Sequence, residues 1–74
     1  MSRLPAASGR EVVKALATIG YVFDHQRGSH ITLRNVVPPH RRITVPEHKE
    51  IAKGTLRKII RDAGLSVEEF IKLL

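Results

Sequence analysis

The chain has 74 residues, no cysteine, and 13 lysines and arginines against 7 aspartates and glutamates, so its formal net charge is +6. This length fits one domain, residues 1–74, that buries too little surface for a deep pocket around a large cofactor. The lack of cysteine excludes disulfides, thiolate catalysis and cysteine-ligated zinc, and it fits a reducing compartment. We find no apolar run typical of a signal peptide or of a membrane span, and therefore expect a soluble cytoplasmic domain.

Positive charge is concentrated in the middle of the chain. Nine basic residues between His25 and Arg61 are opposed only by Glu47 and Glu50. The nine are Arg27, Arg34, Arg41, Arg42, Lys49, Lys53, Arg57, Lys58 and Arg61. Such a field suits the phosphate backbone of a nucleic acid. An acidic protein partner would suit it too, and a basic surface can also serve solubility alone.

The first predicted element is a helix that follows a flexible arm, residues 1–7. Ser8 and Glu11 have the spacing of a capping box, in which each side chain bonds the backbone N–H of the other. The apolar residues Val12, Ala15, Leu16 and Ile19 then recur at helical spacing. Gly20 is expected to end the helix in the left-handed conformation.

Three short strands are predicted next. Residues 21–25 are rich in β-forming side chains, residues 26–29 supply a turn around Gly28, and residues 30–34 alternate apolar and polar side chains. Residues 35–40 contain two adjacent prolines and must be a loop, because proline cannot donate a ladder hydrogen bond. The third strand covers residues 41–45 and is ended by Pro46.

The alternation assigns each side chain of the last two strands to one face of the sheet. The core face carries Ile31, Leu33, Ile43 and Val45, and the open face carries His30, Thr32, Arg34, Arg42 and Thr44. A register error of one residue would bury two arginines, so this assignment is well determined.

Two helices are predicted after the strands. One opens at Gly54-Thr55 and ends at Gly64, and its apolar side carries Leu56, Ile59, Ile60 and Ala63. A second capping box, from Ser66 to Glu69, starts a short last helix that is expected to bury Val67, Phe70, Ile71 and Leu74. The predicted fold is α+β with the order α-β-β-β-α plus a short C-terminal helix. It has an antiparallel three-stranded sheet and helices on one face.

His30 is the candidate catalytic residue, because it lies on the open face beside a turn and among arginines. Histidine can take and give a proton near neutral pH, and arginine can hold a phosphate. Ribonuclease chemistry needs a base for the ribose 2′-hydroxyl, a cation for the phosphoryl oxygens and an acid for the leaving oxygen, and it needs no metal or other cofactor. Either His30 does both proton transfers or a second group helps, and the residues leave this open.

The other three histidines are weaker candidates for the catalytic role. His25 lies near the end of the first strand and is either a neighbour of His30 or a plain edge residue. His40 follows the proline pair in a loop and looks solvated, and His48 is interpreted as a surface residue. The spacing of the four histidines matches no familiar zinc site, so no metal is expected.

Four stretches, in order, resemble the HicA (YcfA-like) toxin family of toxin–antitoxin systems. They are SGREVVKALATIGY, QRGSHITL, RRITVP followed by HKEIAKGTLRKIIRDAGL, and SVEEFIKLL. The resemblance runs over nearly the whole chain. In many members a second histidine follows the glycine-serine-histidine motif, whereas this chain has Ile31, which would face the core.

The resemblance implies a double-stranded-RNA-binding-domain fold and the activity of an mRNA interferase, with the family's catalytic histidine at His30. Together with the strand parity, it implies an RNA-binding set of Arg27, Gly28, Ser29, Arg34, Arg42 and Lys53. A HicB-like antitoxin is expected to cover His30, and the toxin alone is expected to be a monomer that forms a larger complex with it. In such systems the antitoxin or the complex often binds operator DNA.

Two alternatives stay open at this point. A non-catalytic RNA-binding module would use the same basic face, because such domains read shape through phosphate and 2′-hydroxyl contacts. A protein-interaction domain would dock an acidic partner on that face.

Overall fold

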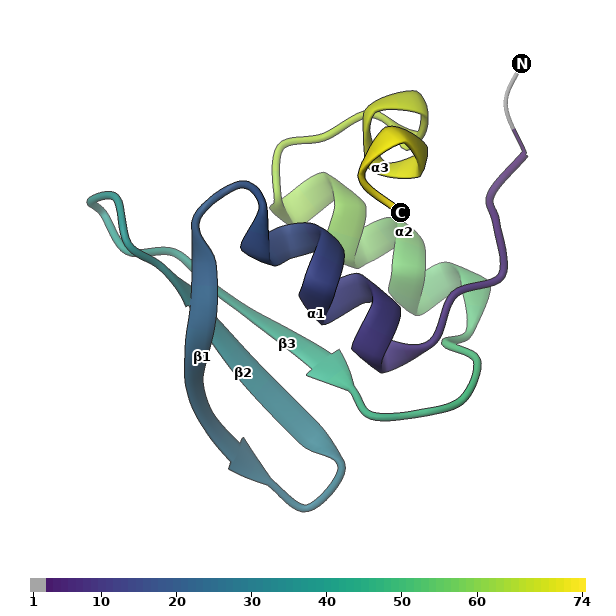
Figure 1. Ribbon diagram of the computed structural model, residues 1–74. Helices are drawn as coiled ribbons and strands as arrows, with labels where there is room; N and C mark the ends of the chain where they lie inside the picture. The colour runs from purple at the N-terminus through teal and green to yellow at the C-terminus, as the bar shows by residue number, and fades with distance from the viewer. Residues whose placement is uncertain (1–2) are drawn as a thin grey trace.

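The computed structural model describes residues 3–74 and has the predicted element order (Figure 1). The elements are α1 (Gly9–Ala17), β1 (Tyr21–Arg27), β2 (His30–Asn35), β3 (Arg42–Pro46), α2 (Lys53–Asp62) and α3 (Val67–Leu73). The strands form one antiparallel sheet in the order β1-β2-β3. This confirms the α-β-β-β-α fold with a short C-terminal helix. Within residues 3–74, no helix combines the length and the apolar character needed to cross a membrane.

The segment before α1 is attached to the core where the structure describes it. Of the arm expected over residues 1–7, Met1 and Ser2 lie outside the described residues. Leu4 packs against the core, and Ala7 is only 2% exposed. The carbonyl oxygen of Ala7 also accepts a hydrogen bond of 2.9 Å from the backbone N–H of Ile51. Residues 4–7 therefore lie beside the segment that leads into α2.

The capping box at the start of α1 is present. The backbone N–H of Glu11 donates to Ser8 Oγ at 3.1 Å, and the backbone N–H of Ser8 donates to Glu11 Oε1 at 2.9 Å. The helix ends at Ala17, earlier than the apolar spacing suggested, because the Thr18 hydroxyl and backbone N–H both turn back onto the carbonyl of Ala15. Gly20 has a φ of +98°, as expected for a left-handed residue after the helix.

The β1–β2 hairpin is longer and tighter than the sequence suggested. The strand β1 continues to Arg27, so the turn consists of Gly28 and Ser29 alone. Gly28 has a φ of +57°, which a two-residue turn requires and which glycine adopts without strain. A β-bulge lies between Phe23 and His25, where Asp24 is the extra residue without a partner on β2.

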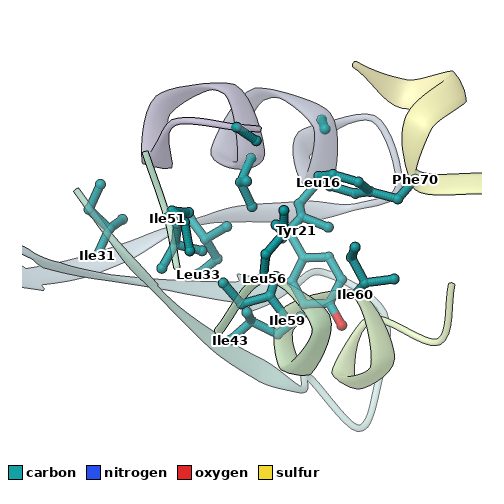
Figure 2. Close-up of a cluster of buried hydrophobic side chains, with 14 residues drawn as sticks. Leu16, Tyr21, Ile31, Leu33, Ile43, Ile51, Leu56, Ile59, Ile60 and Phe70 are labelled. Atoms are coloured by element: carbon teal, nitrogen blue, oxygen red, sulfur yellow. The ribbon is translucent and has the colours of Figure 1, made fainter. Parts of the chain in front are cut away.

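The core lies between the sheet and the helices, and the predicted core face is confirmed (Figure 2). The four predicted side chains, Ile31, Leu33, Ile43 and Val45, are at most 7% exposed. Strand β3 pairs with β2 so that Ile31 faces Val45 and Leu33 faces Ile43. These pairs meet apolar side chains of α1 and α2, among them Leu16 and Leu56.

The last helix contacts α1 and α2 rather than the sheet (Figure 1). Of its residues, all described by the structure, only Phe70 is buried, and its ring lies against Leu16 (Figure 2). The prediction that this helix also buries Ile71 and Leu74 is wrong, since they are 37% and 48% exposed. The helix packs on α1 and α2 through Phe70, with Leu73 partly buried against the core.

Candidate functional site

His30 lies at the first position of β2, directly after the hairpin turn, and is exposed. Its cross-strand partner on β1 is Arg27, and its partner on β3 is Pro46. Arg27 and His30 therefore face the same side of the sheet, which is the side that no element of residues 3–74 covers (Figure 1). Residues directly opposite each other on paired strands have Cβ atoms about 5 Å apart, so a cation lies within reach of the histidine.

The bulge in β1 is what brings Arg27 opposite His30. The register before the bulge pairs Phe23 with Leu33, on the core side of the sheet. Continued past Asp24 without the bulge, the same register would have paired Gln26 with His30 and Arg27 with Ser29. With the bulge, His25 pairs with Thr32 and Arg27 pairs with His30. His25 is thus on the same face as His30 but two residues farther along the strands.

A shallow cleft of about 330 Å³ opens beside His30. It is lined by His30, Thr44, Pro46, His48, Ala52 and Thr55. These residues come from the hairpin, from β3, from the connection after β3 and from the start of α2. His30 and His48 are the two members whose side chains exchange protons near neutral pH. The fold therefore brings together two histidines that are 18 positions apart in the sequence.

Two hydrogen bonds tie the hairpin to the connection between β3 and α2, and a third ties that connection to α1. The backbone N–H of Glu47 donates to the carbonyl oxygen of Ser29, and the Gln26 side-chain amide donates to Glu47 Oε1 at 2.9 Å. The backbone N–H of Gly9 donates to the carbonyl oxygen of His48 at 2.9 Å. The residues next to His30 and the backbone of His48 are therefore tied both to each other and to the start of α1.

The start of α2 forms the far wall of the cleft. Ala52 and Thr55 line the cleft from this side. The helix has no side-chain cap and no acidic residue in its first turn. Nothing in this first turn carries a negative charge that would repel a phosphate group.

Arg34 and Arg42 lie at the other end of the open face. They pair directly with each other across β2 and β3. Four residues of strand separate Arg34 from His30, which corresponds to roughly 13 Å at about 3.3 Å per residue. A phosphate held by Arg34 and Arg42 is therefore not the phosphate next to His30.

Asp24 lies between these two arginines. Its carboxylate accepts a hydrogen bond from His25 Nδ1 at 2.9 Å, lies 3.4 Å from Arg42 Nε and lies 3.8 Å from Arg34 Nε. The hydrogen bond from His25, supported by Arg42, lowers the pKa of the Asp24 carboxyl below its ordinary value. A negative side chain thus occupies the place where a phosphate oxygen would contact both arginines.

Lys53 is separated from the other predicted RNA-binding residues. Its Nζ donates to the carbonyl oxygen of Leu4 at 3.3 Å, and it lines a different hollow of about 430 Å³ together with Arg3 and Arg57. Lys53 does not line the cleft beside His30, although its neighbours Ala52 and Thr55 do. The structure therefore divides the predicted set into the hairpin with Arg27, Gly28 and Ser29, the arginine pair, and Lys53.

The sequence did not single out Asp24 or His48 as functional residues. No local pattern marks the bulge that turns Asp24 toward the arginines. The sequence spacing of His30 and His48 does not indicate that they lie close together, because their proximity depends on how β3 and the connection after it are placed. Arg34 and Arg42 lie on the expected face, and Arg27, which was expected in the turn, lies on that same face as the last residue of β1. Within residues 3–74, histidine, aspartate and glutamate side chains form no group of three that could hold a metal ion.

The family model described as the HicA toxin of bacterial toxin–antitoxin systems matches residues 9–65. Among solved structures, a chain of a toxin–antitoxin complex from Streptococcus pneumoniae is 36% identical and has a TM-score of 0.67; the match covers 78% of this chain and 97% of that chain. No curated protein matches this chain.

Proposed function

The chain belongs to the HicA toxin family, and from that premise we propose that it is a metal-independent endoribonuclease that cleaves mRNA with His30 as the general base. The observation that carries this proposal is the position of His30. It lies exposed at the tip of a hairpin, on the uncovered side of a basic sheet, with Arg27 as its cross-strand partner. A structural role in the core is inconsistent with that position.

The chemistry follows from these groups. The His30 imidazole takes the proton of a ribose 2′-hydroxyl, and the 2′-oxygen then attacks the adjacent phosphorus. Arg27 is the cation directly opposite His30 across the hairpin and stabilises the charge that develops on the phosphoryl oxygens. The backbone of Gly28 and Ser29 forms the turn that brings these two side chains opposite each other.

The other basic residues bind the RNA chain on either side of the cleaved linkage. Arg34 and Arg42 hold a phosphate about 13 Å away along β2. Lys53, with Arg3 and Arg57, continues the positive surface past the start of α2. These contacts are sequence-independent, because they are made to phosphates, and they make RNA binding dependent on salt concentration.

We also propose an antitoxin partner. The structure from Streptococcus pneumoniae is titled a toxin–antitoxin complex, and the site of this chain is an open surface that a partner can cover without entering a deep pocket. A HicB-like antitoxin that covers His30 in the cytoplasm would block access of RNA to the cleft. The toxin alone is then a monomer, and the larger assembly forms with the antitoxin.

The test is cleavage of a labelled single-stranded RNA of mixed sequence by the purified chain in the presence of EDTA. The wild type and the His40→Ala variant, which changes a histidine in the β2–β3 loop, are expected to cleave it. His30→Ala is expected to bind the RNA without cleaving it, and expression of this variant should not arrest growth. A 2′-deoxy substitution at the cleaved position should abolish cleavage there.

Two results would contradict the proposal. Cleavage by His30→Ala at the wild-type rate would show that His30 is not the base. Binding of RNA without cleavage by the wild type, at any salt concentration that permits binding, would identify a non-catalytic RNA-binding module instead.

A further inference from the structure

The cleft beside His30 contains a second histidine in a position that the proposed reaction needs to fill. Removal of the 2′-hydroxyl proton is only half of the proton transfer, since the 5′-oxygen that leaves must also be protonated. A single histidine would have to change its protonation state within one step to do both. We infer that His48 is the general acid that protonates this leaving oxygen, an inference that rests on the proposed function of His30.

The lining of the cleft limits which groups could serve. Besides the two histidines it consists of Thr44, Pro46, Ala52 and Thr55. Alcohols do not give up protons near neutral pH, and proline and alanine side chains have none to give. Among the residues described around this cleft, His48 is therefore the group besides His30 with suitable acid–base chemistry.

The geometry also favours one histidine acting as the base and the other as the acid. His30 comes from β2, whereas His48 comes from the connection between β3 and α2. In an in-line displacement the attacking and the leaving oxygen lie on opposite sides of the phosphorus. Two groups from different walls of one cleft can reach these two oxygens at the same time, whereas one side chain reaches only one of them.

The backbone of His48 is held firmly enough for this role. Its carbonyl oxygen accepts the hydrogen bond from Gly9, and the preceding residue, Glu47, is bonded through its backbone N–H to Ser29. These bonds use backbone atoms of His48 and leave its imidazole free to face the cleft. A side-chain substitution at this position should therefore leave the fold intact.

His48 also borders a second hollow, lined by Ser8, Arg10, Glu47 and Lys49. The charged and titratable groups that face it are thus Arg10, Glu47, Lys49 and, across the cleft, His30. The Glu47 carboxylate is shared with Arg10, whose Nη2 lies 3.6 Å from Glu47 Oε2. Histidine is the side-chain type that ordinarily exchanges protons near neutral pH, so a pH dependence of the rate in that range reports on the two histidines.

The complete step balances without a further reactant. His30 takes the proton of the 2′-hydroxyl, the 2′-oxygen forms a bond to phosphorus, and the bond from phosphorus to the 5′-oxygen breaks. His48, initially protonated, gives its proton to that oxygen. The products are a 2′,3′-cyclic phosphate and a 5′-hydroxyl, and exchange of protons with water returns both histidines to their starting states.

The experiment compares two RNA oligonucleotides that differ only at the cleaved linkage. One has the natural 5′-oxygen, and the other has a bridging 5′-sulfur, which leaves as a thiolate and needs no proton. His48→Gln should cleave the natural linkage about 10²- to 10⁴-fold more slowly than the wild type, the usual contribution of one acid–base group. It should cleave the sulfur linkage at nearly the wild-type rate, whereas His30→Ala should be slow on both.

The pH profile gives a second readout. The wild-type rate should rise and then fall with increasing pH, because the base must be unprotonated and the acid protonated. With His48→Gln the fall at high pH should disappear and the rise should stay. Circular dichroism and thermal unfolding check that the variant is folded, and His40→Gln serves as the matched control that changes a histidine outside the cleft.

The outcomes separate this inference from the proposal on which it rests. If the wild type cleaves RNA and His48→Gln cleaves the natural linkage equally well, His48 is not the acid but the proposed function stands. An equal slowing on both linkages would also overturn the inference, because it would indicate a role in binding or positioning. If the wild type cleaves neither RNA, both proposals fail together.

Discussion

The backbone N–H of Glu47 donates a hydrogen bond to the carbonyl oxygen of Ser29 across 2.6 Å. These are the residues immediately before His48 and His30, so this one bond joins the two chain segments that carry the histidines. The Gln26 side chain reinforces it from the hairpin side by bonding both Gly28 and Glu47. The hairpin and the β3–α2 connection are distant in the sequence, and their attachment to each other creates the cleft.

Gly9 supports this arrangement from the start of α1. Its backbone N–H bonds the carbonyl oxygen of His48, and a Cβ atom at this position would collide with the backbone of Pro46 and Glu47. We predict that Gly9→Ala pushes the connection away from α1, lowers the free energy of unfolding by about 1–3 kcal/mol, as overpacking does, and reduces RNA cleavage. Chemical denaturation and a cleavage assay measure the two effects.

Gly54→Ala is the matched control for that change. A Cβ atom at Gly54 meets nothing within 4 Å, and Gly54 lies inside α2 with ordinary helical geometry. Alanine should therefore be neutral or stabilise the chain by up to about 1 kcal/mol through its higher helix propensity. If both variants shifted the unfolding midpoint equally, the close approach at Gly9 would not be the cause.

Asp24 is predicted to weaken RNA binding, because its carboxylate occupies the space between Arg34 and Arg42. Two arginines directly opposite each other repel, and the carboxylate offsets that repulsion until a phosphate replaces it. Asp24→Asn, made in the His30→Ala background, should bind single-stranded RNA about two- to fivefold more tightly, a small gain because exposed ion pairs contribute little. Fluorescence anisotropy at several salt concentrations measures the affinity.

Asp62→Asn controls for the change in net charge. Asp62 also pairs with a cation, Lys58 at 2.9 Å, but it lies at the end of α2 and not on the open face of the sheet. Both variants add one unit of positive charge to the chain, so a general electrostatic effect would strengthen RNA binding equally in the two. A clear gain for Asp24→Asn alone is the expected result.

Phe70 is predicted to hold α3 in place. It is fully buried, whereas Ile71 on the same helix is 37% exposed. Phe70→Ala should lower the free energy of unfolding by about 3–5 kcal/mol, the usual cost of removing a buried phenylalanine, and Ile71→Ala should cost less than about 1 kcal/mol. Urea denaturation monitored by circular dichroism distinguishes them, and similar losses for both would mean that α3 does not pack as described.

The stability of the chain should fall in acid. Hydrogen bonds from the Ser8 backbone and hydroxyl lower the pKa of Glu11, and those from Ser66 lower the pKa of Glu69 in the same way. The pKa of Asp62 is lowered by the hydrogen bond from Lys58. A carboxyl whose pKa is lower in the folded chain than in the unfolded chain stabilises the fold above its unfolded pKa of about 4.

That stabilisation is lost as the pH falls through the folded pKa values of these carboxyls. The unfolding temperature should therefore be flat between about pH 5 and pH 6 and should drop below about pH 4. The double variant Glu11→Gln with Glu69→Gln keeps side chains that can still cap the helices but cannot titrate. It should show a smaller drop, and an unchanged or steeper drop would assign the acid sensitivity to other groups.

Local patterns accounted for most of the fold. The two capping boxes, the positive φ of Gly20, and the alternation along β2 and β3 depend on a few neighbouring residues each, and all are present in the structure. The sequence was less informative about α3, where an apolar spacing suggested four buried side chains. How much of a helix is buried depends on the area of its contact with other elements, and this area cannot be predicted from a local sequence pattern.

Local patterns also predicted part of the candidate site. Alternation placed His30, Arg34 and Arg42 on one face, because a strand has a period of two residues and the opposite assignment would bury charge. Alternation could not predict the bulge at Asp24. The extra residue moves every later residue of β1 to the opposite face of the sheet, and nothing in the composition of the strand marks its position. The pairing of Arg27 with His30 depends on that bulge.

The sequence by itself therefore determined the order of the elements, the face of the sheet on which His30 lies and the family to which the chain is similar, because each is encoded by residue type and short-range spacing. Only the tertiary structure decided that Asp24 lies between two arginines, that Lys53 lies apart from the hairpin and that His48 shares a cleft with His30. The last of these relations depends on backbone hydrogen bonds between distant segments, such as Glu47 with Ser29 and Gly9 with His48. Backbone groups are the same in every residue, so their pairing leaves no mark in the sequence.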